Sequence, residues 1–259
     1  MWGAATVACI YPFSSATFRR ALKRRWSRQL VGILGMKIGA GGTATPVPVG
    51  LLVCNHISWL DIFVINALAP TAFVSKNDVK HWPLIGWLCA KTETIFLERG
   101  SRAAAQRTRE RIVGELGAGA HVGIFPEGTT TDGSRVLPFH AALFQGAIDA
   151  GVPVVPLALR YVDAAGRPSR APAYDGDVTL WQCLLAIARA DGLVAQVRVL
   201  APFAPAGFDR RHLASRCHRA IAWHLGPLDG HAEAIPSPAE SPSDDTASGI
   251  PGDPQVAPR

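Results

Sequence analysis

Acidic residues are missing from the first 60 positions of this 259-residue chain, and the first carboxylate is that of Asp61. The last 29 residues hold five acids and one base, so they contribute −4 to a net charge of +6, and residues 1–230 carry +10. This imbalance predicts that the body of the protein is attracted to an anionic partner. The bases that precede Asp61 are Arg19, Arg20, Lys23, Arg24, Arg25, Arg28 and Lys37.

Several motifs of catalytic and metal-binding proteins are also missing. The five cysteines form no CxxC pair, which is typical of reduced thiols in a cytosol-facing protein rather than a disulfide framework or a metal cluster. The histidines at 81, 121 and 140 follow no ligand spacing such as HExxH, so no metal is expected. No GxSxG segment is present, and a nucleophile supplied by the protein is therefore not evident.

No long apolar run opens the chain. The segment MWGAATVACIYPF is shorter than the roughly 20 residues that span a bilayer, and its basic run follows the apolar one, unlike a signal peptide. The short apolar segment would also be explained if this sequence began within the last turns of a transmembrane helix. Residues 18–38 then place Leu22, Trp26, Leu30, Ile33 and Leu34 at near-helical intervals between basic residues. We interpret residues 1–40 as a membrane-interface helical segment; the alternatives are a packed helix with a solvated face and a nucleic-acid patch.

The other end of the chain has a different composition. Residues 230–259 are rich in Pro, Ser, Ala and Asp and contain almost no large apolar side chains. Such a segment cannot bury enough surface to offset the entropy lost on ordering, so a disordered tail is expected there.

Between these ends, residues 41–229 alternate short apolar runs with helical stretches. The pattern predicts an α/β fold, a single domain with a largely parallel central sheet flanked by helices and preceded by the N-terminal membrane-associating helices. Ser101 is placed to cap a helix that ends near Gly117, and Pro138 to start one that ends at Gly151. The predicted strands are 49–55, 71–76, 94–99, 121–128 and 152–162, with a helix over 59–69 and a turn over 81–91.

Polar residues follow three of these strands directly, at 55–56, 98–99 and 126–130. Strand ends of a parallel sheet are where site residues gather, so the three clusters predict one site. His56 and Asp61 would lie about 140° apart on a regular helix. They can meet if His56 lies in the loop before the helix and Asp61 in its first turn, where the carboxylate orients the imidazole for base catalysis. A purely structural histidine is the alternative.

The ordered segments NHISWLD, TIFLERGSR, FPEGTT and VPVVPL resemble the four signature blocks of the lysophospholipid and glycerolipid acyltransferase family, of the 1-acylglycerol-3-phosphate acyltransferase type. The resemblance covers roughly residues 25–225. It implies transfer of a fatty acyl chain from acyl-CoA or acyl carrier protein, as cosubstrates without a further cofactor, to the free hydroxyl of a lysolipid. It also implies attachment to an anionic membrane leaflet, at the cytosolic face of the inner membrane.

The resemblance assigns roles block by block. His56 is expected to be the general base and Asp61 its orienting partner, while Arg99 binds the phosphate or other anionic headgroup of the acceptor. The acceptor pocket is expected to involve Glu127, Gly128, Thr129 and Thr130, with Lys76, Arg102 and Arg135 as further cations. Pro153 and Pro156 are expected on the acyl-donor side, unless they serve the strand alone.

One position departs from the family pattern. The third block commonly reads FPEGTR, and here Thr130 stands in place of the arginine. The expected acceptor is 1-acyl-sn-glycerol-3-phosphate, but the lost cation makes lyso-ornithine lipid an alternative. The longer segment FPEGTTTDGSRVLPF is similar to bacterial lyso-ornithine lipid acyltransferases and to some lysophosphatidylcholine-type members. A non-catalytic lipid-binding protein on the same fold is the further alternative, and a nucleic-acid partner is not expected.

Overall fold

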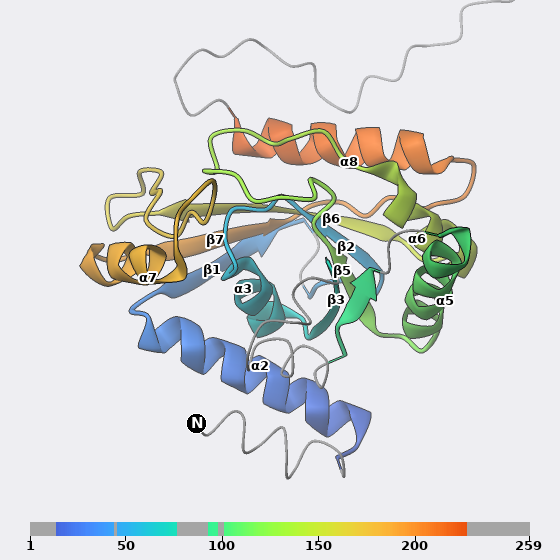
Figure 1. Cartoon of the computed structure of the whole chain (residues 1–259), viewed down its shortest axis with the longest axis horizontal. Coiled ribbons are helices and arrows are strands. Elements are labelled where there is room, and N and C mark those ends of the chain that lie inside the picture. Colours follow the sequence, from blue (N-terminus) through green and yellow to red (C-terminus); the bar gives the residue numbers. More distant parts are fainter. Residues whose placement is uncertain (1–13, 44–45, 77–92, 98–100, 227–259) are drawn as a thin grey trace, which may run out of the picture.

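In the computed structural model, the described residues are 14–43, 46–76, 93–97 and 101–226 (Figure 1). They form a seven-stranded sheet in the order β1-β7-β6-β2-β5-β3-β4. Only the β6–β7 pair is antiparallel among the neighbours described, so the predicted α/β fold with a largely parallel sheet is confirmed. The strands are β1 Lys37–Gly42, β2 Leu51–Cys54, β3 Thr71–Lys76, β4 Ile95–Leu97, β5 His121–Ile124, β6 Val154–Val162 and β7 Val194–Val199.

Helices cover both faces of the sheet (Figure 1). The first face carries α2 (Ala16–Ile33), α3 (Asp61–Leu68) and α7 (Leu180–Arg189), whose inward side chains share one apolar cluster. A second cluster joins α5 (Arg102–Gly117), the short 3₁₀ helix η3 (Ala141–Phe144), α6 (Gln145–Ala150) and α8 (Arg210–Leu225) on the opposite face. The molecule is therefore a three-layer α/β/α structure.

The central strand β2 shows why the sequence folds in this way. All four of its residues are buried; Leu51 and Val53 join the cluster under α8, and Leu52 and Cys54 join the cluster under α3. A strand whose alternate side chains both meet helices needs apolar residues at every position. This continuous apolar run ends at Asn55, where the polar residues of the site begin.

Several local predictions are confirmed. β3 spans residues 71–76 as predicted, and the Ser101 side chain caps α5 by accepting a hydrogen bond from the Ala104 amide at 3.1 Å. The helix expected from Pro138 begins later, at Ala141, because His140 is extended and its amide donates to the Pro126 carbonyl at 2.9 Å. That helix ends as predicted at Gly151, in the left-handed region. The predicted turn over 81–91 and the tail over 230–259 lie outside the described residues.

The N-terminal helix packs on the domain. The ring of Trp26 meets Phe63 of α3 edge-on at 5.7 Å, and Val31 is buried, whereas Arg24 and Arg25 are exposed. Part of the apolar stripe of α2 therefore faces protein, and its outward side is basic. The helix stops at Ile33, ahead of β1, and the boundary expected between residues 40 and 41 falls inside β1, which pairs with β7.

None of the helices in the described ranges combines the length and the apolar character needed to cross a bilayer.

One base of α2 is buried. Lys23 is 7% exposed and pairs with Glu93 through Nζ and Oε2 at 2.8 Å, so it is opposed in space although no acid lies near it in the sequence. The same ammonium donates to the Thr71 carbonyl at 3.3 Å. Burial lowers the pKa of Lys23, and the Glu93 carboxylate opposes that shift.

Replacing Lys23 by methionine is expected to destabilise the fold by about 1–3 kcal/mol, because it strands a partly buried carboxylate on Glu93. Thermal and urea unfolding measure the change. Arg25→Met on the exposed side of the same helix is the matched control and should stay within about 0.5 kcal/mol of wild type. Equal stability of both variants would show that the Lys23–Glu93 pair does not hold α2 to the sheet.

Candidate active site

His56 and Asp61 meet at the end of β2. His56 lies in the loop after the strand and Asp61 is the first residue of α3, the arrangement required for the two to touch. Nδ1 of His56 lies 2.8 Å from Oδ2 of Asp61. The Asp61 side chain is 0% exposed, whereas 18% of the His56 side chain is exposed. The carboxylate of Asp61 is therefore shielded from solvent, whereas the imidazole of His56 is accessible to solvent.

The buried carboxylate of Asp61 has donors on both oxygens. Besides the imidazole, Oδ2 accepts hydrogen bonds from the amides of Ile57 at 2.7 Å and Ser58 at 2.9 Å. Oδ1 accepts one from the hydroxyl of Tyr161, at the end of β6, at 2.6 Å. A buried charge is tolerated only when it is paired and hydrogen-bonded in this way. Burial and then the Asp61 charge raise the pKa of Tyr161 well above its ordinary value, so the phenol remains a donor.

These bonds fix the chemical form of the histidine. Because Nδ1 faces a carboxylate, the neutral imidazole carries its proton on Nδ1, and the lone pair is on Nε2. The Phe125 ring stacks on the imidazole with centroids 3.9 Å apart and planes 11° apart, which restricts its rotation. His56 is thus oriented to accept a proton at Nε2.

Glu127 ties the histidine to the neighbouring loop. Oε1 accepts from the His56 amide and Oε2 from the Leu137 amide, both at 2.8 Å. The residue is 5% exposed, and burial raises the pKa of its carboxyl although both amide bonds oppose the shift. Both oxygens of Glu127 are therefore occupied by main-chain donors that position His56.

The loop after β5 makes further contacts with the histidine segment. The Thr131 amide donates to the His56 carbonyl at 2.9 Å, and the Thr130 hydroxyl donates to the Tyr174 carbonyl. Gly128 has a φ of +72°, and a Cβ there would lie 3.3 Å from the His140 ring, so glycine fits both the conformation and the space. Thr129 is exposed.

The expected cations are only partly described. Arg135 is exposed on the loop, whereas Arg99 and the side chains of Lys76 and Arg102 lie outside the described part of the structure. Pro153 is half-buried before β6, and Pro156 is buried within β6 opposite Val53.

Two residues beside the dyad were not predicted from the sequence, namely Tyr161 on Asp61 and Phe125 on His56. Asn55 belongs to the polar cluster predicted at 55–56, and its side-chain amide exchanges two 2.9 Å hydrogen bonds with the main chain of Leu159. A signal for Tyr161 was present, because Leu157, Leu159 and Tyr161 alternate along β6 and face the α3 side together. Phe125 left no comparable pattern.

Tyr161→Phe is expected to lower stability by about 1–3 kcal/mol, since Oδ1 of buried Asp61 loses its donor. The value of kcat/KM should also fall, because the carboxylate that orients His56 is held less firmly. Tyr174→Phe, which removes a hydroxyl elsewhere, should keep the wild-type kcat/KM. A lower stability with an unchanged kcat/KM would assign Tyr161 to packing alone.

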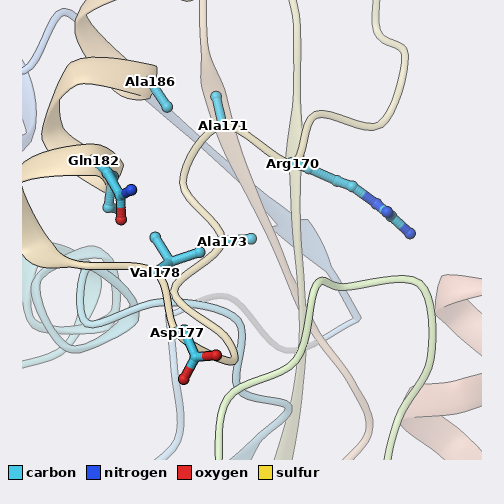
Figure 2. Close-up of a pocket in the computed structure, with 8 residues that line it drawn as sticks. Arg170, Ala171, Ala173, Asp177, Val178, Gln182 and Ala186 are labelled. Carbon is cyan, nitrogen blue, oxygen red and sulfur yellow. The ribbon is translucent and has the colours of Figure 1, made fainter.

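An open cavity of about 460 Å³ lies between α7 and the segment that precedes it, and neither His56 nor Asp61 is among its lining residues (Figure 2). Gln182 and Ala186 of α7 line one wall, and Ala173 and Val178 of the preceding segment line another. Figure 2 shows the side chain of Arg170 extending away from α7. Across the described ranges, no group of three or more His, Cys, Asp or Glu side chains is placed to hold a metal ion.

Comparisons with known proteins find several similar chains. The Acyltransferase family pattern matches residues 43–160. The chain is 37% identical over 203 residues to a lyso-ornithine lipid O-acyltransferase of Pseudomonas aeruginosa, covering 78% of each chain. It is 39% identical over 171 residues to a 1-acyl-sn-glycerol-3-phosphate acyltransferase of Neisseria meningitidis serogroup B, covering 66% of this chain and 67% of the relative.

A solved structure shares the fold. The crystal structure of the 1-acyl-sn-glycerophosphate acyltransferase PlsC from Thermotoga maritima superposes with a TM-score of 0.62 and covers 88% of this chain and 89% of its own. Sequence identity between the two is 19%, so the likeness concerns the fold alone.

Proposed function

This chain belongs to the acyltransferase family, and on that premise we propose that it transfers a fatty acyl group from a thioester to the free hydroxyl of a lysolipid. The observation that carries the proposal is the 2.8 Å contact of His56 with a fully buried Asp61. It leaves Nε2 of a partly exposed imidazole as a proton acceptor. The relatives named above act on lysolipids, according to their names.

The reaction proceeds by direct attack. Nε2 of His56 takes the proton of the acceptor hydroxyl while the oxygen bonds to the thioester carbonyl carbon. The tetrahedral intermediate then collapses, the carbon–sulfur bond breaks, and the imidazolium returns its proton to the leaving thiolate. Asp61 stabilises the imidazolium between these steps, and Tyr161 holds the carboxylate in place.

The donor is an acyl thioester of coenzyme A or of acyl carrier protein, which acts as a cosubstrate. Pro153 and Pro156 remain a prediction for the acyl-donor side. Pro153 lies just before β6, and Pro156 lies within β6 beside Val53 of β2. These positions support at least a role in shaping β6, the strand on which Tyr161 lies.

For the acceptor we propose 1-acyl-sn-glycerol-3-phosphate, with Arg99 as the headgroup cation assisted by Lys76 and Arg135. Lyso-ornithine lipid is the second candidate because Thr130 replaces a cation with a neutral side chain whose hydroxyl is already bonded to Tyr174. The relative named for lyso-ornithine lipid also aligns over a larger share of the chain. The two headgroups differ in charge, so a single cation can shift the preference between them.

We place this reaction at the cytosolic face of the inner membrane, where a lysolipid acceptor resides. The exposed arginines on the outward side of α2 support attachment to an anionic leaflet, each contributing roughly 1 kcal/mol near such a surface.

Purified enzyme supplied with labelled acyl-CoA or acyl carrier protein, and with each lysolipid in parallel, tests the proposal. We expect transfer to lysophosphatidic acid or lyso-ornithine lipid, resolved by product mass. Lysophosphatidylcholine serves as the choline-headgroup comparison. A well-folded enzyme that acylates none of these acceptors from either donor contradicts the proposed function.

Thr130→Arg is expected to raise the ratio of turnover on lysophosphatidic acid to that on lyso-ornithine lipid by about tenfold, since it restores a charge-assisted contact to phosphate. Thr130→Val is the matched variant, because it also loses the hydroxyl bond to Tyr174 but adds no charge. Equal ratios in the two variants would show that this position does not select the headgroup.

A further inference from the structure

Large apolar side chains are partly exposed along the outward side of α7 and at Val178, two residues before the helix begins. Val178 is 36%, Leu180 42%, Trp181 73% and Leu185 37% exposed. We name these four residues the α7 apolar face. The opposite side of the same helix buries Cys183 and Ile187 in the cluster shared with α2 and α3. The helix is therefore apolar on both sides, which is uncommon for a surface helix.

We propose that the α7 apolar face is a membrane-docking surface that holds α7 and the open cavity beside it against a lipid bilayer. No charged residue occurs from Val178 to Ala188. Trp181 and Leu185 are four residues apart, so they lie on the same side of the helix. An indole with 73% exposure is poorly placed in water but suits the bilayer interface, where apolar and polar surroundings meet.

The position of α7 links this surface to the reaction. The Cys183 thiol contacts the Pro172 carbonyl at 3.6 Å. Two residues further, the Tyr174 amide donates to the Ile57 carbonyl at 3.0 Å, and Ile57 adjoins His56. The path from the α7 apolar face to the dyad thus passes through one short segment, which also borders the open cavity (Figure 2).

Charge favours a bilayer over a second copy of the chain. The helical layer that holds α7 also holds α2, with exposed Arg24 and Arg25 and with Ile33 at 82% exposure. Two copies joined here would bring together two chains of net charge +6, which repel, whereas an anionic leaflet attracts them. The inference rests on the proposed function in one respect: a lysolipid acceptor resides in the bilayer.

Trp181→Glu tests the docking surface, with Trp181→Gln as a milder variant. Trp223→Glu is the matched control, since Trp223 is also exposed, at 44%, but lies on α8 across the sheet. Partitioning of the full chain onto phosphatidylcholine vesicles containing phosphatidylglycerol is measured by sedimentation. We expect Trp181→Glu to weaken partitioning about tenfold, Trp181→Gln less, and Trp223→Glu to match wild type.

A second readout separates docking from chemistry. Turnover on a short-chain lysolipid dispersed as monomers should be unchanged in Trp181→Glu, while turnover on the same headgroup in vesicles falls. Wild-type partitioning in both Trp181 variants overturns the proposal, as does a wild-type dimer that Trp181→Glu dissociates without loss of vesicle binding. If wild type binds vesicles but acylates nothing, the proposed function fails and the docking surface is still judged by the vesicle assay.

Discussion

Replacing His56 by alanine is expected to lower acyl transfer by about 10²–10⁴-fold or more while leaving the fold intact. The side chain is partly exposed and leaves its main-chain bonds to Glu127 and Thr131 unchanged when it is truncated. Initial rates with saturating thioester and a lysolipid acceptor measure the loss, and thermal unfolding checks the fold.

His212→Ala is the matched control for this variant. His212 lies in the first turn of α8, in an exposed pair with Asp209, and such a pair contributes little to stability. Near-normal turnover in His56→Ala would reject the base assignment and return His56 to a structural role.

Asp61→Asn should reduce turnover by about 10³–10⁴-fold, comparable to the loss of the aspartate in a Ser-His-Asp triad. An asparagine oxygen can take the place of Oδ2 toward His56 and the two amides, and its NH₂ group can donate to the Tyr161 oxygen. The geometry then survives while the charge that stabilises the imidazolium is lost.

The loss of charge is separated from a loss of structure by measuring rates and unfolding temperatures of Asp61→Asn and comparing them with those of Asp163→Asn. Asp163 forms an exposed pair with Arg167 far from the dyad in sequence, and its neutralisation should leave turnover unchanged. Retention of more than about a tenth of the activity in Asp61→Asn would show that the carboxylate acts through position alone and not through charge.

The parts of the fold that were predictable depend on local rules. The cap at Ser101, the stop at Gly151 and the continuous apolar strand β2 each follow from neighbouring residues, and all are found in the structure. The His56–Asp61 contact was also predictable, because a loop and a first helical turn five residues apart leave few other arrangements.

The parts that were missed depend on residues distant in the chain. Tyr161 is 100 positions from Asp61, and no short pattern joins them. The apolar side chains of α2 were interpreted as facing a membrane, since one sequence does not show that α3 lies under Trp26. Lys23 was grouped with the bases that precede the first acid, and its partner Glu93 is 70 positions away in the sequence.

The two main-chain hydrogen bonds of Glu127 allow the sequence of the neighbouring loop to vary between related enzymes. One carboxylate binds the main chain of both His56 and Leu137, so its bonds do not depend on which side chains the intervening loop carries. Thr129 and Arg135 point to solvent from that loop and are free to change under selection without disturbing the base. The catalytic base can therefore be retained in evolution while the preferred headgroup changes, and the relatives are named for two different acceptors.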